Sequence, residues 1–285
     1  MGHRRARRRW IAAGGRGGSA RGLRIAGPSL VALILAASAA SIVSLLLWSL
    51  SGAWRFPDAL PMAFTTATWA RMSSAVADPA AVSLMVGLLS TAAAILLALA
   101  CLEAESRHGF RPGRRALALI WLPLLLPQLS FLFGFQVALV RAGLDATTFA
   151  VVWAHLLFVL PYVFLSLADA WRAMDPRYAR TAAALGAGPW RIFLRVKVPL
   201  VLRPLSVAAA IGFAVSIGLY LPTLFAGAGR IATLTTEAVT LAAGSDRRIL
   251  GVYAAAQAAM PLLAYALAAA VPALLHRNRR GMRPT

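Results

Sequence analysis

Lysine, cysteine and acidic residues are scarce in this sequence of 285 residues. Lys197 is the only lysine, Cys101 is the only cysteine, and nine Asp and Glu residues stand against 29 basic residues. A single cysteine excludes an intramolecular disulfide framework. A Walker A phosphate loop needs a lysine followed by Ser or Thr, whereas Lys197 is followed by Val198. The sequence therefore contains no P-loop for hydrolysing ATP.

Charged residues of both signs make up only 13% of the sequence, and 60% of it is hydrophobic. A soluble domain carries about 25% charged and roughly 45–50% apolar residues. The apolar residues here form long runs separated by basic clusters, which is typical of a polytopic membrane protein. The net charge of +20 does not indicate nucleic acid as a partner, because the arginines do not form a polar face interleaved with aromatics.

Six apolar runs are long enough to cross a membrane, since a spanning helix needs about 20 mainly apolar residues. Lipid offers no water to satisfy the backbone, so these runs are expected to be helices. The predicted fold class is all-α, a polytopic membrane protein with six transmembrane helices. The predicted spans are Pro28–Leu50, Ala80–Leu102, Ala116–Leu139, Thr148–Ala170, Pro204–Ala226 and Leu250–Leu274.

Prolines and small residues mark particular places in these runs. Ala208, Gly212 and Ser216 are spaced four apart, as are Gly87 and Thr91, which predicts faces where helices approach closely. A proline removes a helix hydrogen bond and can kink the helix. Ordinary kinks and functional hinges both remain open for these positions. The prolines within the runs are Pro123, Pro127, Pro161, Pro222, Pro261 and Pro272.

The distribution of arginine predicts the orientation. All but six of the 29 basic residues lie in the two tails, in the loop between the second and third spans, and in the loop 171–203. The positive-inside rule places these segments in the cytoplasm, so the expected location is the inner membrane, multi-pass, with both termini cytoplasmic. The six residues on the opposite side are Arg55, Arg71, Arg141, Arg230, Arg247 and Arg248.

The first 27 residues are expected to form a flexible basic tail that contacts anionic lipid headgroups. The apolar run that follows is too long for the core of a cleavable signal peptide, so it is interpreted as a retained first helix. Residues 28–79 then comprise this helix and a periplasmic loop, and residues 275–285 form a second basic cytoplasmic tail.

The loop 171–203 carries signals for two short helices. Asp175-Pro176 is a helix start with a capping residue and a proline at the first position. Gly186 is expected to end this first helix. Gly188-Pro189 then turns the chain into a second short helix over Pro189–Val196, which Pro199 ends before the fifth span.

Apolar side chains among arginines are expected at the tip of this helix–turn–helix. Such a surface outside a membrane suggests docking to a protein, although an amphipathic helix lying on the membrane remains an alternative. The apolar residues are Leu185, Ala187, Trp190, Ile192 and Phe193.

This loop resembles the EAA loop of the permease subunits of binding-protein-dependent ABC importers with the type I fold. Gly186 and Pro199 have the spacing of the glycine and proline in that motif, and the loop lies between the fourth and fifth spans as in the family. Arg180 stands where the motif has glutamate and Thr181 where it has its first alanine. The ATPase-coupling residues that the resemblance implies are Arg180, Ala182, Ala183, Gly186, Ala187, Pro189, Trp190, Phe193 and Pro199.

The resemblance implies a transmembrane domain over residues 80–274 with a cytoplasmic coupling helix between the fourth and fifth spans. It also implies a separate ATPase dimer, a periplasmic binding protein that delivers a small solute, and a second permease subunit, either another copy or a homologue. Arg180 implies an adjusted partner surface or weaker coupling. The segment from Tyr220 to Tyr253 is similar to permeases of the thiamine or polyamine uptake group.

Few polar residues lie at membrane depth, where they are costly and often functional. Gln128, Gln136, Tyr220 and Gln257 are the candidate pathway residues, with interhelical hydrogen bonding as the alternative role, and His155 is expected at an interface. No catalytic constellation, cofactor site or metal-ligand cluster is evident, so the chain is not predicted to be an enzyme. A six-span carrier or membrane scaffold without an ATPase remains the second functional class.

Overall fold

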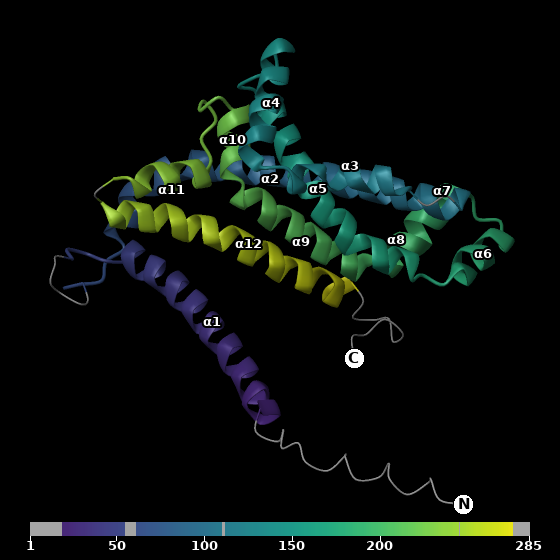
Figure 1. Cartoon of the computed structure of the whole chain (residues 1–285), viewed down its shortest axis with the longest axis horizontal. Helices are drawn as coiled ribbons and strands as arrows, with labels where there is room; N and C mark the ends of the chain where they lie inside the picture. Colours follow the sequence, from purple (N-terminus) through teal and green to yellow (C-terminus); the bar gives the residue numbers. More distant parts are fainter. Residues whose placement is uncertain (1–18, 55–60, 110–111, 245, 276–285) are drawn as a thin grey trace, which may run out of the picture.

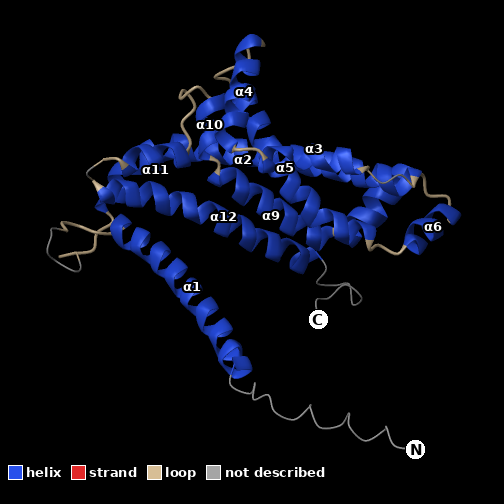
Figure 2. Ribbon diagram, in the orientation of Figure 1, coloured by secondary structure: helices blue, strands red, loops and turns tan. Residues whose placement is uncertain are grey.

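The computed structural model describes residues 19–54, 61–109, 112–244 and 246–275. These residues form helices joined by short loops, which confirms the all-α fold class (Figure 2). The nearest approach to a sheet among them is one isolated antiparallel bridge between Ser51 and Phe64.

The helices are α1 (Ser19–Ser49), α2 (Ala67–His108), α3 (Arg114–Leu125), α4 (Gln128–Arg141), α5 (Thr148–Arg172), α6 (Pro176–Ala184), α7 (Pro189–Ile192), the π-helix η1 (Phe193–Lys197), α8 (Val198–Leu200), α9 (Leu202–Gly218), α10 (Tyr220–Ala226), α11 (Leu234–Ala242) and α12 (Arg247–Leu275). Figure 1 shows α2, α5, α9 and α12 running along a common long axis, with α6 to α8 at one end and α11 at the other.

Four helices of the described chain are long and apolar enough to cross a membrane unbroken. The number rises to six if each of two bent pairs counts as one span: α3 with α4, and the helical piece Pro189–Leu200 with α9. The four unbroken spans are Ser29–Ser49 within α1, and α2, α5 and α12. The predicted first, second, fourth and sixth spans therefore correspond to continuous helices.

The predicted third span, Ala116–Leu139, is not one helix. It consists of α3 and α4, which meet at an angle of 103°, and α4 stands across the long axis beside α10 (Figure 1). Leu126 adopts an extended backbone conformation, as the residue before a proline generally does. Pro127 also lacks the N–H that would bond the carbonyl of Pro123, so the helix ends here.

The predicted fifth span, Pro204–Ala226, is also interrupted. Leu219 is extended and separates α9 from α10. Pro222 has no N–H to offer the carbonyl of Gly218, and glycine itself weakens a helix interior. Two of the six prolines in the predicted spans thus coincide with breaks, whereas Pro161 lies inside continuous α5.

The predicted second span is part of a longer helix. α2 begins at Ala67, ahead of the expected Ala80, and has 42 residues with Pro79 inside it. At about 1.5 Å per residue, α2 is roughly 60 Å long, and it runs along much of the bundle in Figure 1. The expected boundary at residue 79 therefore falls within this helix.

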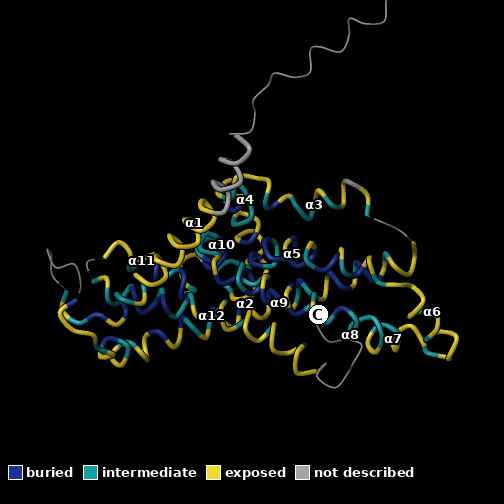
Figure 3. Tube along the Cα trace, turned by 90° about the horizontal axis from the view of Figure 1, so that it is seen from below, coloured by how far each residue is buried: buried dark blue, intermediate teal, exposed yellow. Residues whose placement is uncertain are grey.

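The core lies where α2, α5 and α9 pack together, and the buried residues gather along these helices in Figure 3. The faces of close approach that the small-residue spacing predicts, around Gly87 and Gly212, are confirmed. A Cβ atom on Gly212 would lie 2.8 Å from Cγ2 of Val163 and 3.1 Å from Cγ2 of Thr91. On Gly87 it would lie 2.8 Å from the ring of Phe213. Both glycines let the neighbouring helices approach.

Gly212→Ala is expected to lower the free energy of unfolding by about 1 to 3 kcal/mol, because it overpacks a filled core. The measurement is the midpoint of thermal denaturation in detergent, followed by fluorescence-detected size exclusion. Gly134→Ala in α4 is the matched control, since a Cβ atom there would meet nothing within 4 Å. Equal midpoints for the two variants would contradict the packing argument.

Helix α1 stands apart from the bundle over much of its length and meets α12 near its own end (Figure 1). A Cβ atom on Gly251 would lie 2.6 Å from the backbone nitrogen of Ser49, so glycine is required at this crossing. The expected flexible tail 1–27 is only partly described. Its residues from Ser19 onward belong to α1, while residues 1–18 and the tail residues 276–285 lie outside the described chain.

Candidate functional site: the α6–α8 segment

The segment between α5 and α9, residues 173–201, begins with the capped helix that its sequence predicts. The side chain of Asp175 accepts a hydrogen bond of 2.8 Å from the backbone N–H of Arg177, and Pro176 occupies the first turn of α6. This satisfies one of the free N–H groups at a helix start. We call residues 173–201 the α6–α8 segment.

Gly186 ends this first helix, as predicted. Its φ of +81° lies in the left-handed region, which glycine adopts without steric cost. The N–H groups of Gly186 and Ala187 return to the carbonyls of Ala183 and Ala182 at 2.9 and 3.0 Å, a hydrogen-bonded helix end. The chain then turns at Gly188, and α7 starts at Pro189.

The second half of the segment differs from the prediction. The helix that starts at Pro189 continues as the π-helix η1 and then as α8, so it ends at Leu200 and Pro199 lies within it. Pro199 directly follows the first residue of α8, and without an N–H it cannot bond a carbonyl of the preceding turn. The helical piece 189–200 meets α9 at an angle of 77°. A π-helix is rare and often occurs at functional sites.

The segment exposes four large apolar side chains, and two of them are more exposed than Tyr178 and Leu194, which are each 57% exposed. Leu185 is 83% exposed and Trp190 is 69% exposed, and we call this pair the apolar tip. Phe193, expected on the same surface, is half-buried, and its ring lies between Trp190, 5.5 Å away, and the buried Trp171, 5.9 Å away. The apolar surface predicted from sequence is therefore smaller and centred on Leu185 and Trp190.

Three arginines surround the apolar tip. Arg180, Arg191 and Arg195 are exposed, and none of them forms an ion pair with another described residue of the chain. We call them the arginine rim. Of the two alanines in the motif, Ala183 is exposed and Ala182 is half-buried. An exposed apolar patch with a polar rim is typical of a protein–protein contact.

The end of α2 holds the segment through charged residues that the sequence analysis missed. Lys197 Nζ lies 2.6 Å from Glu103 Oε2 and donates a hydrogen bond of 2.8 Å to Ser106 Oγ. Arg107 pairs with Glu103 at 2.7 Å and donates to the carbonyl of Pro189 at 3.4 Å. The signal in the sequence was Glu103 itself, an acidic residue among basic clusters and close to the end of an apolar run.

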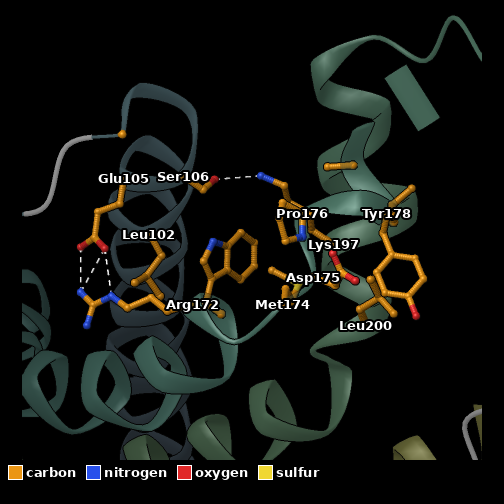
Figure 4. A pocket seen from close by; sticks show the side chains of 14 residues that line it. Leu102, Glu105, Ser106, Arg172, Met174, Asp175, Pro176, Tyr178, Lys197 and Leu200 are labelled. Carbon is orange, nitrogen blue, oxygen red and sulfur yellow. Dashed lines mark hydrogen bonds and ion pairs between the residues drawn. The ribbon is translucent and has the colours of Figure 1, made fainter. Parts of the chain in front are cut away.

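A cavity of about 450 Å³ lies between the segment, the end of α2 and the end of α5. Figure 4 shows Lys197 reaching toward Ser106 on one side of it, and Arg172 pairing with Glu105 on the other. Arg172 and Glu105 are joined by hydrogen bonds of 3.0 and 3.1 Å, which fix the end of α5 to α2. The cavity shows that the segment is not packed solidly against the bundle.

A second polar cluster lies inside the bundle around His155, which is 2% exposed and not interfacial as expected. Its Nδ1 lies 2.7 Å from Oγ of Ser216 and its Nε2 lies 2.8 Å from Oγ1 of Thr223. Thr223 donates its hydroxyl proton to the carbonyl of Leu219, so Nε2–H donates to Thr223. Burying an imidazole without hydrogen-bond partners is costly. Ser216 and Thr223, one on each side of the break at Leu219, provide the hydroxyls that contact the two ring nitrogens of His155.

His155→Leu is expected to lower the free energy of unfolding by about 1 to 3 kcal/mol, because it removes a partner from two buried hydroxyls. His155→Gln, which retains a polar side chain, is the control and is expected to lose less. Thermal denaturation in detergent measures both. A leucine variant as stable as the wild type would show that the cluster contributes nothing to stability.

The four candidate pathway residues do not form one cluster. Gln128 and Gln136 are on α4 and Tyr220 begins α10, and these two helices pack against each other. Gln257 is on α12, which packs against α1, α2, α9 and α11. All four side chains are half-buried. Their role in a pathway stays a prediction.

No group of three or more His, Cys, Asp or Glu residues that could hold a metal ion occurs in the part of the chain that the structure describes. The α6–α8 segment combines exposed apolar groups, guanidinium groups without an ion pair to another described residue, and a charged attachment to α2. Nothing in this arrangement resembles a nucleophile with its base.

Comparison with known proteins gives one family. The profile of the family described as "Binding-protein-dependent transport system inner membrane component" matches residues 97–280. The match therefore includes the end of α2, the whole α6–α8 segment and α12.

Individual relatives agree with this match. The chain is 44% identical over 201 residues to the "Inner membrane ABC transporter permease protein YnjC" of Escherichia coli (strain K12), an alignment that covers 70% of this chain and 38% of that protein. It is 32% identical over 185 residues to the "Molybdenum transport system permease protein ModB" of Mycobacterium tuberculosis (strain ATCC 25618 / H37Rv), covering 59% of this chain and 70% of the relative. The chain thus spans well under half of the length of the Escherichia coli relative.

Proposed function

The chain belongs to the family of binding-protein-dependent transport system inner membrane components, and on this premise we propose that it is the membrane-spanning permease subunit of an ABC importer. In this proposal the helices form half of a translocation pathway for a small solute, and a separate subunit hydrolyses ATP. The family is the non-catalytic membrane component of such transporters, in keeping with a sequence whose single lysine cannot complete a Walker A loop.

The observation that carries the proposal is the exposed apolar tip within its arginine rim at one end of the helices. Leu185 and Trp190 expose most of their surface, and the matched region of the family contains them. An exposed apolar patch rimmed by polar residues marks a protein–protein contact. We assign it to docking on the ATPase, with Arg180, Ala182, Ala183, Gly186, Ala187 and Pro189 in the coupling surface and Phe193 and Pro199 supporting it.

The proposed orientation follows from the charges. The two basic tails and the α6–α8 segment lie in the cytoplasm by the positive-inside rule, which brings the apolar tip to the side where ATP is available. α11 then lies on the outer side, where a binding protein would deliver the solute. Residues 80–274 serve as the transmembrane domain, and a second six-span unit, a copy or a homologue, completes the pathway.

The transported solute is proposed only as a small molecule delivered by the binding protein. The resemblance of the segment from Tyr220 to Tyr253 suggests thiamine or a polyamine as the solute. The mycobacterial relative is named as a permease of a molybdenum transport system, so a molybdenum compound is a further candidate. Gln128, Gln136, Tyr220 and Gln257 are proposed to line the pathway. Calorimetric titration of the binding protein encoded beside this chain with these solutes would select among them.

The test is co-purification in detergent of the tagged full chain with the ATPase and the binding protein encoded nearby. The wild-type chain is expected to capture the ATPase, and a chain lacking residues 186–190 is expected to lose it while still inserting in the membrane. A deletion of equal length in the α1–α2 loop, residues 55–59, is the control. Capture that survives the deletion of 186–190 would reject the docking assignment.

A carrier or scaffold that works without an ATPase is the second candidate. It rests on the alternative position of the α6–α8 segment, lying on lipid with its arginines near anionic headgroups. Failure of the wild-type chain to capture any ATPase, together with binding of the purified segment to anionic vesicles, would favour this function.

A further inference from the structure

The ion pairs and the hydrogen bonds involving a side chain that join the α6–α8 segment to the rest of the described bundle all go to the end of one helix. Lys197 contacts Glu103 and Ser106, and the carbonyl of Pro189 accepts from Arg107. Glu103, Ser106 and Arg107 belong to the last turns of α2. Apart from α5 and α9, which the chain itself connects to the segment, α2 is the helix to which these contacts tie it.

Lys197 is the only lysine among 29 basic residues, and its surroundings suit an ammonium group. Its side chain is 13% exposed and that of Glu103 is 11% exposed. Nζ lies 2.6 Å from a carboxylate oxygen, 2.8 Å from a hydroxyl, and 5.8 Å from the ring centre of Trp171. A compact ammonium serves three acceptors in different directions, whereas the flat guanidinium of arginine directs its donors in one plane.

The opposite part of α2 holds the helices at the other end of the bundle. Ser83 Oγ accepts a hydrogen bond of 2.9 Å from the N–H of Leu234, the first residue of α11. The carbonyl of Ala75 accepts one of 3.1 Å from the hydroxyl of Tyr253 on α12. α2 is one continuous helix, and about 30 Å of it joins the contacts at Glu103 to the contact between Ser83 and Leu234. The contact at Ala75 lies further along α2, beyond Pro79.

We propose that the ion pair between Glu103 and Lys197 is the link through which displacement of the α6–α8 segment moves α2, and through α2 the helix α11 at the other end. The inference rests on the proposed function, because the displacement comes from the ATPase. Glu103 and Lys197 are positioning residues: they touch neither solute nor nucleotide. A nearly buried ion pair resists separation more than an exposed one, because either charge left alone is costly.

The experiment uses the full chain reconstituted with its ATPase and binding protein in lipid nanodiscs. Cys101→Ser removes the only cysteine, and Val239→Cys places a bimane fluorophore on an exposed position of α11. The readout is the change in bimane emission when ATP and vanadate trap the ATPase. Capture of the ATPase by each variant is measured separately.

Glu103→Lys and Lys197→Glu are each expected to reduce the emission change roughly 2- to 30-fold, the range for residues that carry coupling between sites. Both variants are expected to capture the ATPase as the unaltered chain does, because the apolar tip is intact. The exchange of both charges in one chain is expected to restore most of the response. Restoration would distinguish a linking pair from a general loss of stability.

The matched control is the neighbouring pair of Glu105 and Arg172, which joins α2 to the last residue of α5 and forms no ion pair with a described residue of the α6–α8 segment. Glu105→Lys makes the same charge change two residues further along α2. It is expected to lower the denaturation temperature while leaving the emission change of the assembled complex as in the unaltered chain.

The outcomes separate the two proposals. Loss of ATPase capture by the unaltered chain itself would reject the proposed function. If the unaltered chain captures the ATPase but shows no emission change at position 239, the inference is overturned. A full emission change in both Glu103→Lys and Lys197→Glu would overturn it as well. So would a charge exchange that responds no better than the single variants, or a Glu105→Lys variant that loses the response equally.

Discussion

Gly186→Asp is expected to lower coupled transport at least about tenfold while the protein still inserts in the membrane. The backbone at Gly186 has a φ of +81°, where a side chain costs about 1 to 2 kcal/mol. The new carboxylate would also lie beside Arg107 and Arg191, which line the same hollow as Gly186. A partner that complements the arginine rim would meet a like charge, and this costs several kcal/mol.

The measurement is uptake into proteoliposomes of the radiolabelled solute that the binding protein captures. We expect a loss of roughly 10- to 1000-fold, from a penalty of several kcal/mol at the docking surface. Two control variants separate the causes. Gly186→Asn keeps the size of aspartate without its charge, and asparagine tolerates the left-handed region. Gly188→Asp adds the charge where φ is −68°, so it brings no strain.

Large loss with Gly186→Asp and Gly188→Asp, but not with Gly186→Asn, would assign the effect to charge. Loss of uptake with Gly186→Asp and Gly186→Asn, but not with Gly188→Asp, would assign the effect to strain of the backbone at Gly186. Full uptake by Gly186→Asp would mean that the glycine turn has no part in coupling.

The sequence predicts the α6–α8 segment well where its signals are local. Asp175-Pro176 and Gly186 act through their own backbone and one or two neighbours, so the start and end of α6 are as expected. The π-helix η1 has no such signal. It arises where Phe193 packs on Trp171 and Lys197 reaches Glu103, contacts that depend on the folded bundle.

Prolines show the same limit within the spans. Pro127 follows Pro123 by one helical turn, and the chain breaks there into α3 and α4. Pro161 remains inside α5, where it is buried and the neighbouring helices α2 and α9 hold the helix straight. Sequence identifies both residues as candidate kinks, but the packing around each one decides the outcome.

The polar contacts that join distant parts of the chain could not be predicted individually. Glu103 and Lys197 are separated by 94 positions, and His155 and Thr223 by 68. The small-residue spacing did predict faces of close approach on the second and fifth spans, now α2 and α9, because close approach needs only small side chains on one face. Which polar groups meet across that contact depends on the register of the helices.

Removal of the apolar tip is expected to have the largest effect on ATPase binding. Leu185→Ala and Trp190→Ala each truncate an exposed apolar side chain that we place at the centre of the interface. Central anchors of this kind cost about 2 kcal/mol or more when truncated, which is roughly 30-fold in dissociation constant. The double variant is expected to weaken binding by about 1000-fold if the two effects add.

The measurement is the dissociation constant of the nanodisc-embedded chain for the purified ATPase, by microscale thermophoresis. Tyr178→Ala is the matched control, because Tyr178 is an aromatic residue of α6 that is 57% exposed but lines the cavity beside α2 and not the tip. We expect it to change the constant by less than about threefold, as for most residues at the edge of an interface. Equal losses for Tyr178→Ala and Trp190→Ala would place the ATPase over the whole of α6. An unchanged constant for the double variant would remove the apolar tip from the interface and leave the arginine rim to hold the ATPase.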